Sequence, residues 1–215
     1  MNAFEFNNKN KLYHYTNLDA LLKIIESGTL KFGKLPKMND ITEASKEIFL
    51  NYNCNNGEPK WENIQIAQNK LMHIGQISLS QDGKRLGFSI NSMWGHYADS
   101  GEGCCIVFDK DIIIRKCKEL CLFYGEVSYD GAVTDIDICE NSSVDDFFND
   151  NCNKLFFHKS QDWSSEQEFR IIKNNNLECK EDGLPIGDAI IAVIFHINCK
   201  CRVFECPRKQ KYLMK

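Results

Sequence analysis

The chain has 215 residues, a length typical of one domain rather than two, so we expect a single domain over residues 1–215. Its 43% hydrophobic and 26% charged residues are ordinary values for a globular protein. A net charge of -4 excludes a general electrostatic attraction to nucleic acid or anionic lipid and leaves room only for a local basic patch.

Eleven cysteines would indicate disulfides in a small secreted protein, but the residues from Met1 to Lys9 include no apolar segment or cleavage signal. We therefore expect a cytoplasmic protein with reduced cysteines. Most of them lie in apolar runs such as Gly103 to Phe108, where a thiol behaves as a small hydrophobic group. No run approaches the ~20 apolar residues of a membrane span, so we expect no membrane partner.

Hydrophobic spacing and the positions of glycine and capping residues predict the elements in the first part of the chain. In order, they are a strand over 12–16, a helix from Leu18 that Gly28 ends, a strand over 29–32, a helix over 42–52, a loop over 53–59, a helix over 61–74 that Gly75 ends, and a strand over 76–80.

The same signals predict the later elements. They are a short helix that Ser92 caps, a strand over 104–108, a helix that Asp109 caps, a strand over 120–129, a helix over 143–157, a charged strand from Glu166, a strand over 189–195 and a candidate last strand over 202–206. Helices gather in the N-terminal half and strands follow them, without regular βαβ alternation. This order favours an α+β fold with a mostly antiparallel sheet.

The charged strand is the most informative stretch. Alternation places Glu166, Glu168 and Arg170 on one face and the residues between them on the other. Two carboxylates on one face would repel each other unless a cation or a hydroxyl-rich ligand receives them, and Arg170 is the internal candidate for that cation. The alternative is an edge strand whose charged face is solvated.

Glu166-Gln167-Glu168 resembles the Glu-x-Glu turn and strand motif of the ADP-ribosyltransferase superfamily. Tyr13-His14-Tyr15-Thr16, followed by a helix, resembles the first motif of its His-Tyr-Glu class, in which the histidine binds a ribose hydroxyl of NAD. That class usually has glycine after the histidine, which lets a backbone amide approach nicotinamide. Tyr15 stands at this position here, so the resemblance does not extend to that backbone contact. Without the resemblance, His14 would be interpreted as a core or edge histidine bonded to a backbone carbonyl.

Two further segments match different classes of the superfamily. Ser78 and Ser80 resemble the Ser-x-Ser element of the arginine class, whereas Ser92 and Tyr97 resemble the serine and the stacking tyrosine of the histidine class. We prefer Tyr97, because aromatic rings stack on nicotinamide and the first motif contains histidine. Packing of a helix on the sheet is the alternative for Trp94 and Tyr97.

Four motifs together resemble a bacterial family of a domain of unknown function. They are Tyr-His-Tyr-Thr at 13–16, Asn-Asp at 39–40, Met-Trp-x-x-Tyr-Ala at 93–98 and Trp-x-x-Glu-x-Glu-x-Arg at 163–170. This resemblance covers most of the chain and implies no activity by itself.

A zinc site is the rival interpretation for the C-terminal thiols. Cys199, Cys201 and Cys206 lie within eight residues, with His196 and Cys179 as the obvious fourth ligands. Zinc sites usually pair one Cys-x-x-Cys with a second pair or with histidines, so we expect no metal.

The resemblance to ADP-ribosyltransferases implies a split antiparallel sheet with NAD bound between the His14 strand and the Glu168 strand. It implies catalytic roles for Glu168 at the ribose, Glu166 at the acceptor nucleophile and His14 at the adenosine-side ribose. NAD contacts would extend to the following residues: His14, Tyr15, Thr16, Ser80, Trp94, Tyr97 and Arg170. The expected activity is ADP-ribosyl transfer or NAD hydrolysis, which would fit a bacterial toxin or a phage-defence effector, with an acceptor that is protein, nucleic acid, a small molecule or water.

Two other functions remain open. One is a non-catalytic module of the same fold that binds a nucleotide, ADP-ribose or nucleic acid, which the tyrosine at position 15 favours. The other is a protein-interaction domain whose charged strand contacts a partner.

Overall fold

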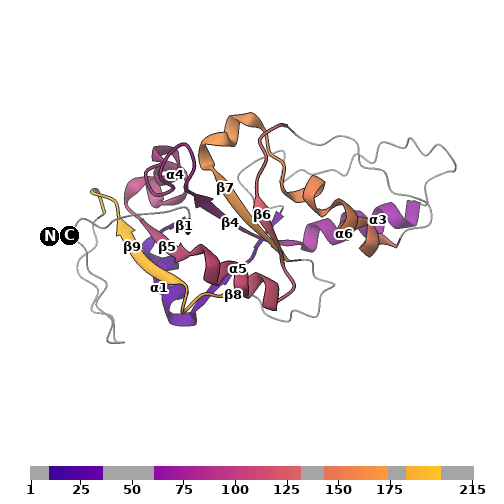
Figure 1. Ribbon diagram of the computed structural model, residues 1–215, viewed down its shortest axis with the longest axis horizontal. Helices are drawn as coiled ribbons and strands as arrows, with labels where there is room; N and C mark the ends of the chain where they lie inside the picture. The colour runs from indigo at the N-terminus through magenta and orange to yellow at the C-terminus, as the bar shows by residue number, and fades with distance from the viewer. Residues whose placement is uncertain (1–9, 36–60, 132–142, 174–182, 200–215) are drawn as a thin grey trace.

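The computed structural model describes residues 10–35, 61–131, 143–173 and 183–199, and its main sheet has seven strands (Figure 1). Six of them follow the order β6 (Phe123–Glu126), β7 (Glu168–Lys173), β4 (Gly75–Gln81), β1 (Lys11–Thr16), β5 (Cys104–Asp109) and β9 (Ile190–Phe195), and the seventh, β3 (Gly33–Lys34), pairs with β4. A second sheet pairs β2 (Thr29–Lys31) with β8 (Gly183–Pro185). Every strand pair in both sheets is antiparallel, which confirms that part of the predicted fold class.

The main sheet splits between β1 and β4. Along one edge, β4 pairs with β7 from Gly75 to Ser80. Along its other edge, only Ser80 and Gln81 meet β1, and only Gly75 and Gln76 meet β3. Among the described strands, none pairs with residues 77–79 on this second edge, so β1 and β3 leave an opening in the middle of the sheet.

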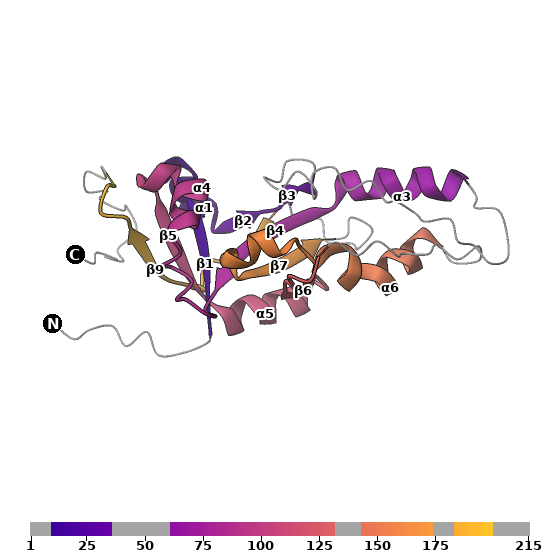
Figure 2. The same cartoon turned by 90° about the horizontal axis from the view of Figure 1, so that it is seen from above.

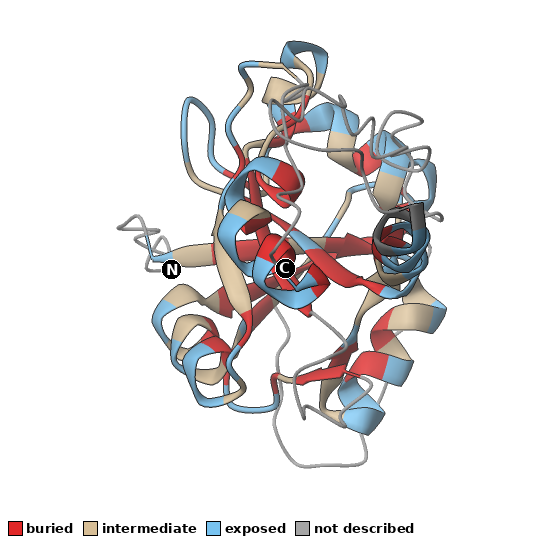
Figure 3. Cartoon of the chain, turned by 90° about the vertical axis from the view of Figure 1, so that its right-hand side faces the viewer, coloured by how far each residue is buried: buried red, intermediate tan, exposed pale blue. Residues whose placement is uncertain are grey.

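Three groups of buried apolar side chains hold the helices on the sheet. One side of β1, β4, β5 and β7 forms a continuous core with α1 (Leu18–Ser27) and α5 (Lys110–Glu119). On the other side, α4 (Asn91–Tyr97) packs on β1 and β5. Beyond β7, α3 (Trp61–His73) and α6 (Val144–Phe156) lie side by side (Figure 2) and bury a cluster rich in phenylalanine. Figure 3 shows the buried residues concentrated on the strands and on the inner faces of these helices.

Local sequence accounts for most element boundaries. The side chain of Asn17 accepts a hydrogen bond from the Ala20 amide at 2.8 Å at the start of α1, and Gly28, at φ 64°, ends that helix as predicted. Asp109 caps α5 and Ser143 caps α6 in the same way. The predicted helix over 61–74 and the predicted strand over 104–108 are confirmed as α3 and β5.

Some local predictions were wrong. Gly75 does not end α3 but begins β4, and Ser92 lies inside α4, which starts without a side-chain cap. The strand predicted over 120–129 is confined to β6. Among the described elements, helices are not confined to the N-terminal half, because α5 and α6 alternate with later strands. Two short 3-10 segments, Asp99–Gly101 and Gln161–Glu166, were not predicted.

Several predictions fall outside the described residues: the helix over 42–52, the loop over 53–59 and the last strand over 202–206. Within α3, the side chains of Trp61 and Ile64 also lie outside the described part of the chain. Within the described ranges, no helix combines the length and the apolar character needed to cross a membrane.

Candidate functional site

The acidic motif is buried and only partly a strand. Glu166 ends the 3-10 segment, Gln167 adopts the left-handed conformation at φ 49°, and β7 begins at Glu168. The prediction that Glu166 lies on the same strand face as Glu168 and Arg170 was therefore wrong. The alternative interpretation, an edge strand with a solvated charged face, was also wrong. β7 lies between β6 and β4, and each of its residues is buried.

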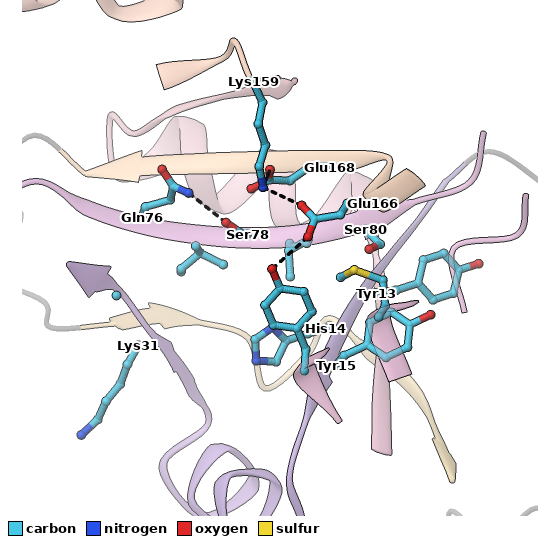
Figure 4. Close-up of a pocket in the computed structure, with 15 residues that line it drawn as sticks. Tyr13, His14, Tyr15, Lys31, Gln76, Ser78, Ser80, Lys159, Glu166 and Glu168 are labelled. Atoms are coloured by element: carbon cyan, nitrogen blue, oxygen red, sulfur yellow. Dashed lines mark hydrogen bonds and ion pairs between the residues drawn. The ribbon is translucent and has the colours of Figure 1, made fainter. Parts of the chain in front are cut away.

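A pocket of about 260 Å³ occupies the split in the sheet (Figure 4). Residues 76–80 of β4 form one wall and residues 13–15 of β1 form another. Met93 and Tyr97 of α4 also line the pocket, together with Lys159, Glu166 and Glu168. Lys31 of β2, an exposed cation, lies at its far end. The pocket thus brings together two predicted catalytic carboxylates and His14, which are more than 150 residues apart in the chain.

Glu168 is fixed in place by Arg170. The Arg170 Nε donates to Glu168 Oε1 at 2.7 Å, and a guanidinium Nη donates to Oε2 at 2.8 Å. Arg170 is 0% exposed and also donates to the Phe156 carbonyl at 2.7 Å, so it lies behind the carboxylate rather than in the pocket. The Glu168 amide donates to the Tyr129 hydroxyl at 2.8 Å. The predicted pairing of Arg170 with this carboxylate is present.

Glu166 is held by a different pair of donors. The Lys159 Nζ lies 2.7 Å from Glu166 Oε2 and 3.6 Å from Glu168 Oε2, and the Tyr97 hydroxyl donates to Glu166 Oε1 at 2.9 Å. Two carboxylates and two cations are therefore buried together. This balance offsets the charge repulsion that two buried carboxylates would otherwise feel.

The two carboxylates differ in acidity. Burial alone would raise the pKa of Glu168, but Arg170, Lys159 and a hydrogen bond from Ser78 together hold that pKa below its usual value. Burial raises the pKa of Glu166, and Lys159 opposes this shift only in part. Glu168 thus stays ionised, whereas Glu166 is the more easily protonated of the two. Neighbouring carboxylates with separated pKa values are typical of sites that perform acid and base chemistry.

The β4 wall supplies polar side chains on the same side of the sheet as Glu168. The Gln76 side-chain amide donates to the Ser78 hydroxyl at 2.9 Å, and Ser78 in turn bonds to Glu168. Ser80 is 1% exposed, and its hydroxyl lacks a hydrogen-bond partner among the described residues. A buried polar group without a partner is uncommon and is often completed by a ligand or water. Ser80, a predicted NAD contact, therefore stands as an open binding group in the pocket wall.

His14 reaches the pocket from the opposite side of the sheet. Its side chain alternates with those of Tyr13 and Tyr15, and its ring bonds to the Ser78 backbone. Burial lowers the pKa of His14 to about 4, although the Ser78 carbonyl acts in the other direction. The ring is therefore neutral near pH 7. Since one ring nitrogen donates its proton to that carbonyl, the other is left as an acceptor.

Of the remaining predicted NAD contacts, some line the pocket and others do not. Tyr15 lines the pocket, but its hydroxyl donates to the Gly87 carbonyl at 2.6 Å. Trp94 packs edge-on against Tyr15 at 5.0 Å between ring centroids and donates to the Phe88 carbonyl, so it belongs to the core. Trp94, Thr16 and Arg170 lie outside the pocket lining, whereas Tyr97 is part of it. The packing alternative thus applies to Trp94 and in part to Tyr97, which packs against the cluster on β1 and β5 as well as lining the pocket.

Lys159, Tyr129 and the role of Gln167 were not predicted from the sequence. Lys159 follows the apolar run Leu155-Phe156-Phe157, and a lysine there would be expected to need a buried anion, which is the one signal that could have identified it. Tyr129 carries no comparable signal. The Gln167 side chain bonds to the backbone of Gln81 and Arg85, and so fixes the loop after β4 to the acidic motif.

The proposed rival metal site is only partly within the described residues. Cys199 and His196 are described, whereas Cys179, Cys201 and Cys206 are not. Within the described part of the chain, no group of three potential ligands could hold a metal ion. Cys105, Cys117 and Cys152 are buried thiols, and burial raises the pKa of Cys117 and of Cys152 to about 12.

Comparison with known proteins relates part of the chain to a family. A family model described as "Protein of unknown function (DUF2971)" matches residues 93–171. This range begins in α4 and ends in β7, and it includes Tyr97, Lys159 and the acidic motif but not His14. It supports the resemblance to a family of a domain of unknown function over this part of the chain. No curated protein and no solved structure matches the chain.

Proposed function

We propose that the pocket binds NAD and that the protein cleaves the bond between nicotinamide and ribose, as an ADP-ribosyltransferase or an NAD glycohydrolase. One observation carries this proposal: the buried pair Glu166 and Glu168 lies across a single pocket from His14, at a split in an antiparallel sheet. These residues stand in the order that the resemblance implies. The split also fits an ADP-ribosyltransferase-like fold, which we propose for the chain.

The reaction needs negative charge beside the ribose. When the bond between ribose C1 and the nicotinamide nitrogen breaks, the nitrogen keeps the electron pair and the ribose develops positive charge. Water or another acceptor then bonds to C1 and loses a proton. Groups held in place before the reaction stabilise such charge most effectively. Glu168, fixed by Arg170, is a group of this kind.

The geometry refines the roles of the two carboxylates. Glu168 already receives two bonds from Arg170 and one from Ser78, with Lys159 nearby, which engages most of the roughly four acceptor positions of a carboxylate. Among the described residues, Glu166 receives hydrogen bonds from Tyr97 and Lys159 and keeps open positions. We therefore assign Glu168 to fixed charge stabilisation. Glu166 would contact a ribose hydroxyl or the incoming nucleophile.

Two further side chains complete the proposal. The unprotonated ring nitrogen of His14 would accept a hydrogen bond from a ribose hydroxyl. The Tyr97 ring, which lines the pocket, would stack on nicotinamide.

The test is release of nicotinamide from NAD, measured by chromatography with and without candidate acceptors. Glu168→Gln, assayed where the variant is folded, should lower the rate by ~10²–10³, because the charge assigned to stabilise the ribose is lost while the shape is kept. Glu166→Gln should instead lower transfer to an acceptor more than simple hydrolysis of NAD. Glu119→Gln, an exposed carboxylate on α5, is the matched control and should retain full activity. If the wild-type protein releases no nicotinamide with any acceptor, the enzymatic proposal fails.

A non-catalytic nucleotide-binding module is the second candidate. The bidentate engagement of Glu168 by Arg170 favours it, because a carboxylate held in this way also serves a purely structural role. Thermal unfolding with NAD or ADP-ribose separates the candidates from a protein-interaction domain. A ligand at 100 times its Kd adds ~2.7 kcal/mol to the free energy of unfolding. Stabilisation without nicotinamide release would indicate the module, and no response to either nucleotide would indicate a protein-interaction domain.

A further inference from the structure

Lys159 is a buried cation placed between the two carboxylates of the pocket. It is 6% exposed, and its Nζ lies 2.7 Å from Glu166 Oε2 and 3.6 Å from Glu168 Oε2. The same ammonium lies 4.6 Å from the centre of the Trp163 ring, which covers it on another side. Figure 4 shows the side chain entering the pocket wall from above, toward Glu166 and Glu168. A lysine is rarely buried to this degree unless it is paired.

The backbone on either side of Lys159 is fixed independently of these charges. The Lys159 amide donates to the Ser128 carbonyl at 2.9 Å, and the Gly131 amide donates to the Lys159 carbonyl at 3.4 Å. Ser128 and His158 also form an isolated parallel β-bridge. The backbone position of Lys159 is therefore set by the segment after β6 and not by α6 alone.

Each cation of the cluster lies closest to a different carboxylate, and Lys159 also lies near the second one. Arg170 directs two nitrogens to Glu168 and a third to the Phe156 carbonyl. Among the described residues, Lys159 is the cation in direct contact with Glu166, and the other donor to Glu166 is the neutral Tyr97 hydroxyl. Without Lys159, Glu166 would lie buried beside an ionised carboxylate with no cation of its own. Desolvation and repulsion would then favour its protonated form.

We propose that Lys159 is a positioning residue that orients Glu166 in the pocket and keeps it ionised for the reaction. This inference rests on the proposed function for its catalytic meaning, but the effect of Lys159 on Glu166 can be measured without turnover. Trp163 would support this role by holding the ammonium in one place. Lys159 itself needs no contact with the substrate.

The direct test is a carboxyl ¹³C NMR titration of protein labelled at glutamate Cδ, in which Glu166→Gln identifies the Glu166 signal. In Lys159→Met, the pKa of Glu166 should rise by ~1–3, the effect expected from loss of an opposite charge at this range. Lys159→Arg should restore a pKa near that of the wild type, because it keeps the charge. Lys173→Met is the matched control, since Lys173 is also buried and lies over an aromatic ring, that of Phe32, 5.8 Å away. It should leave the Glu166 titration unchanged.

Kinetics give a second readout. If Glu166 acts ionised, Lys159→Met should move the acidic limb of the pH profile for nicotinamide release to higher pH, and Lys159→Arg should move it back. An unchanged Glu166 titration in folded Lys159→Met protein overturns the inference, as does failure of Lys159→Arg to restore it. A shifted titration in a protein that releases no nicotinamide would support the positioning of Glu166 by Lys159 and reject the proposed function instead.

Discussion

Arg170 and Glu168 form the most strongly buried charge pair among the described residues. Arg170 is 0% exposed and Glu168 is 4% exposed, and two hydrogen bonds join them. Breaking a buried pair by removing one partner is costly, because the other charge stays in the interior without compensation. This pair contributes to stability as well as to the pocket, whereas Glu166 shares its cation with Glu168.

Glu168→Gln should therefore reduce the free energy of unfolding by ~3–5 kcal/mol, because Arg170 loses its anion. Glu166→Gln should cost clearly less, since Lys159 keeps Glu168 3.6 Å away as a partner. Urea unfolding of both variants at pH 7 measures the difference. Equal losses would show that Arg170 does not depend on Glu168 for its burial.

Ser80 differs from this charge pair, because its buried polar group has no partner among the described residues. Its hydroxyl is buried in the pocket wall without a partner among the described residues, whereas the Ser78 hydroxyl two residues earlier is bonded to Gln76 and Glu168. A buried hydroxyl with no partner carries a desolvation cost that a methyl group does not.

Ser80→Ala should leave the ligand-free protein as stable as the wild type, or up to ~1 kcal/mol more stable, while it weakens binding of NAD or ADP-ribose. Ser78→Ala, the matched control, should destabilise the ligand-free protein because it breaks bonds that exist. Thermal unfolding with and without nucleotide measures both effects. Destabilisation by Ser80→Ala without ligand would indicate that its hydroxyl is already satisfied.

At the scale of elements, the connection from α4 to β5 brings Tyr97 to the pocket. The turn passes so close to β1 that a Cβ on Gly103 would lie 2.3 Å from the Thr16 carbonyl oxygen and 2.9 Å from the Ala98 carbonyl. The Gly103 amide donates to that same Ala98 carbonyl at 2.8 Å. These neighbours are backbone atoms, which cannot move aside as a flexible side chain can.

Gly103→Ala should reduce the free energy of unfolding by ~1–3 kcal/mol, as overpacking does, and should displace α4 from β1. Gly95 lies within α4 with nothing within 4 Å of an added Cβ, so Gly95→Ala should instead stabilise by ~0.5–1 kcal/mol. The two substitutions are identical in chemistry and differ only in surroundings. Urea unfolding of both provides the measurement, and similar changes in the two would contradict the close approach to Thr16.

At the scale of the molecule, the two sides of the sheet differ. One side carries a single apolar core that extends across the split from β5 to β7. The other side carries two separate clusters, one on β1 and β5 and one on β7, α3 and α6. The polar residues of β4 and β7 lie between them. The continuous core thus holds the two halves together, and the interrupted side leaves room for the pocket.

His14 bridges this split through its bond to the Ser78 backbone, and it provides a test of stability against pH. Because its pKa falls from 6.5 to about 4 on folding, the unfolded chain binds more protons between these values. The contribution of His14 to the free energy of unfolding should be fully present above pH 6.5 and should decrease as the pH falls toward 4. His14→Gln lacks this titration, so its stability should depend less on pH across that window. Unfolding measured from pH 7.5 to 4 compares the two, and parallel curves would show that His14 is not buried in its neutral form.

The sequence by itself determined where most of the described helices and strands lie and which side chains are candidates for the pocket. Alternation and capping residues located β1, α1, β5 and α6, because these signals act between residues only a few positions apart. The same sequence predicted His14, Tyr97 and the two glutamates as a set, through the resemblance of its motifs and their order.

Only the tertiary structure decided what surrounds those groups. Alternation could not show that the acidic strand is internal or that Glu166 leaves it, since both depend on the pairing of β7 with β4 and β6. The bond from Tyr97 to Glu166 spans 69 residues, and the contact of Lys159 with Glu168 requires a turn through a 3-10 segment and a left-handed residue. Local patterns carry no information about such distances, because burial and charge pairing are set by which strands become neighbours in the sheet.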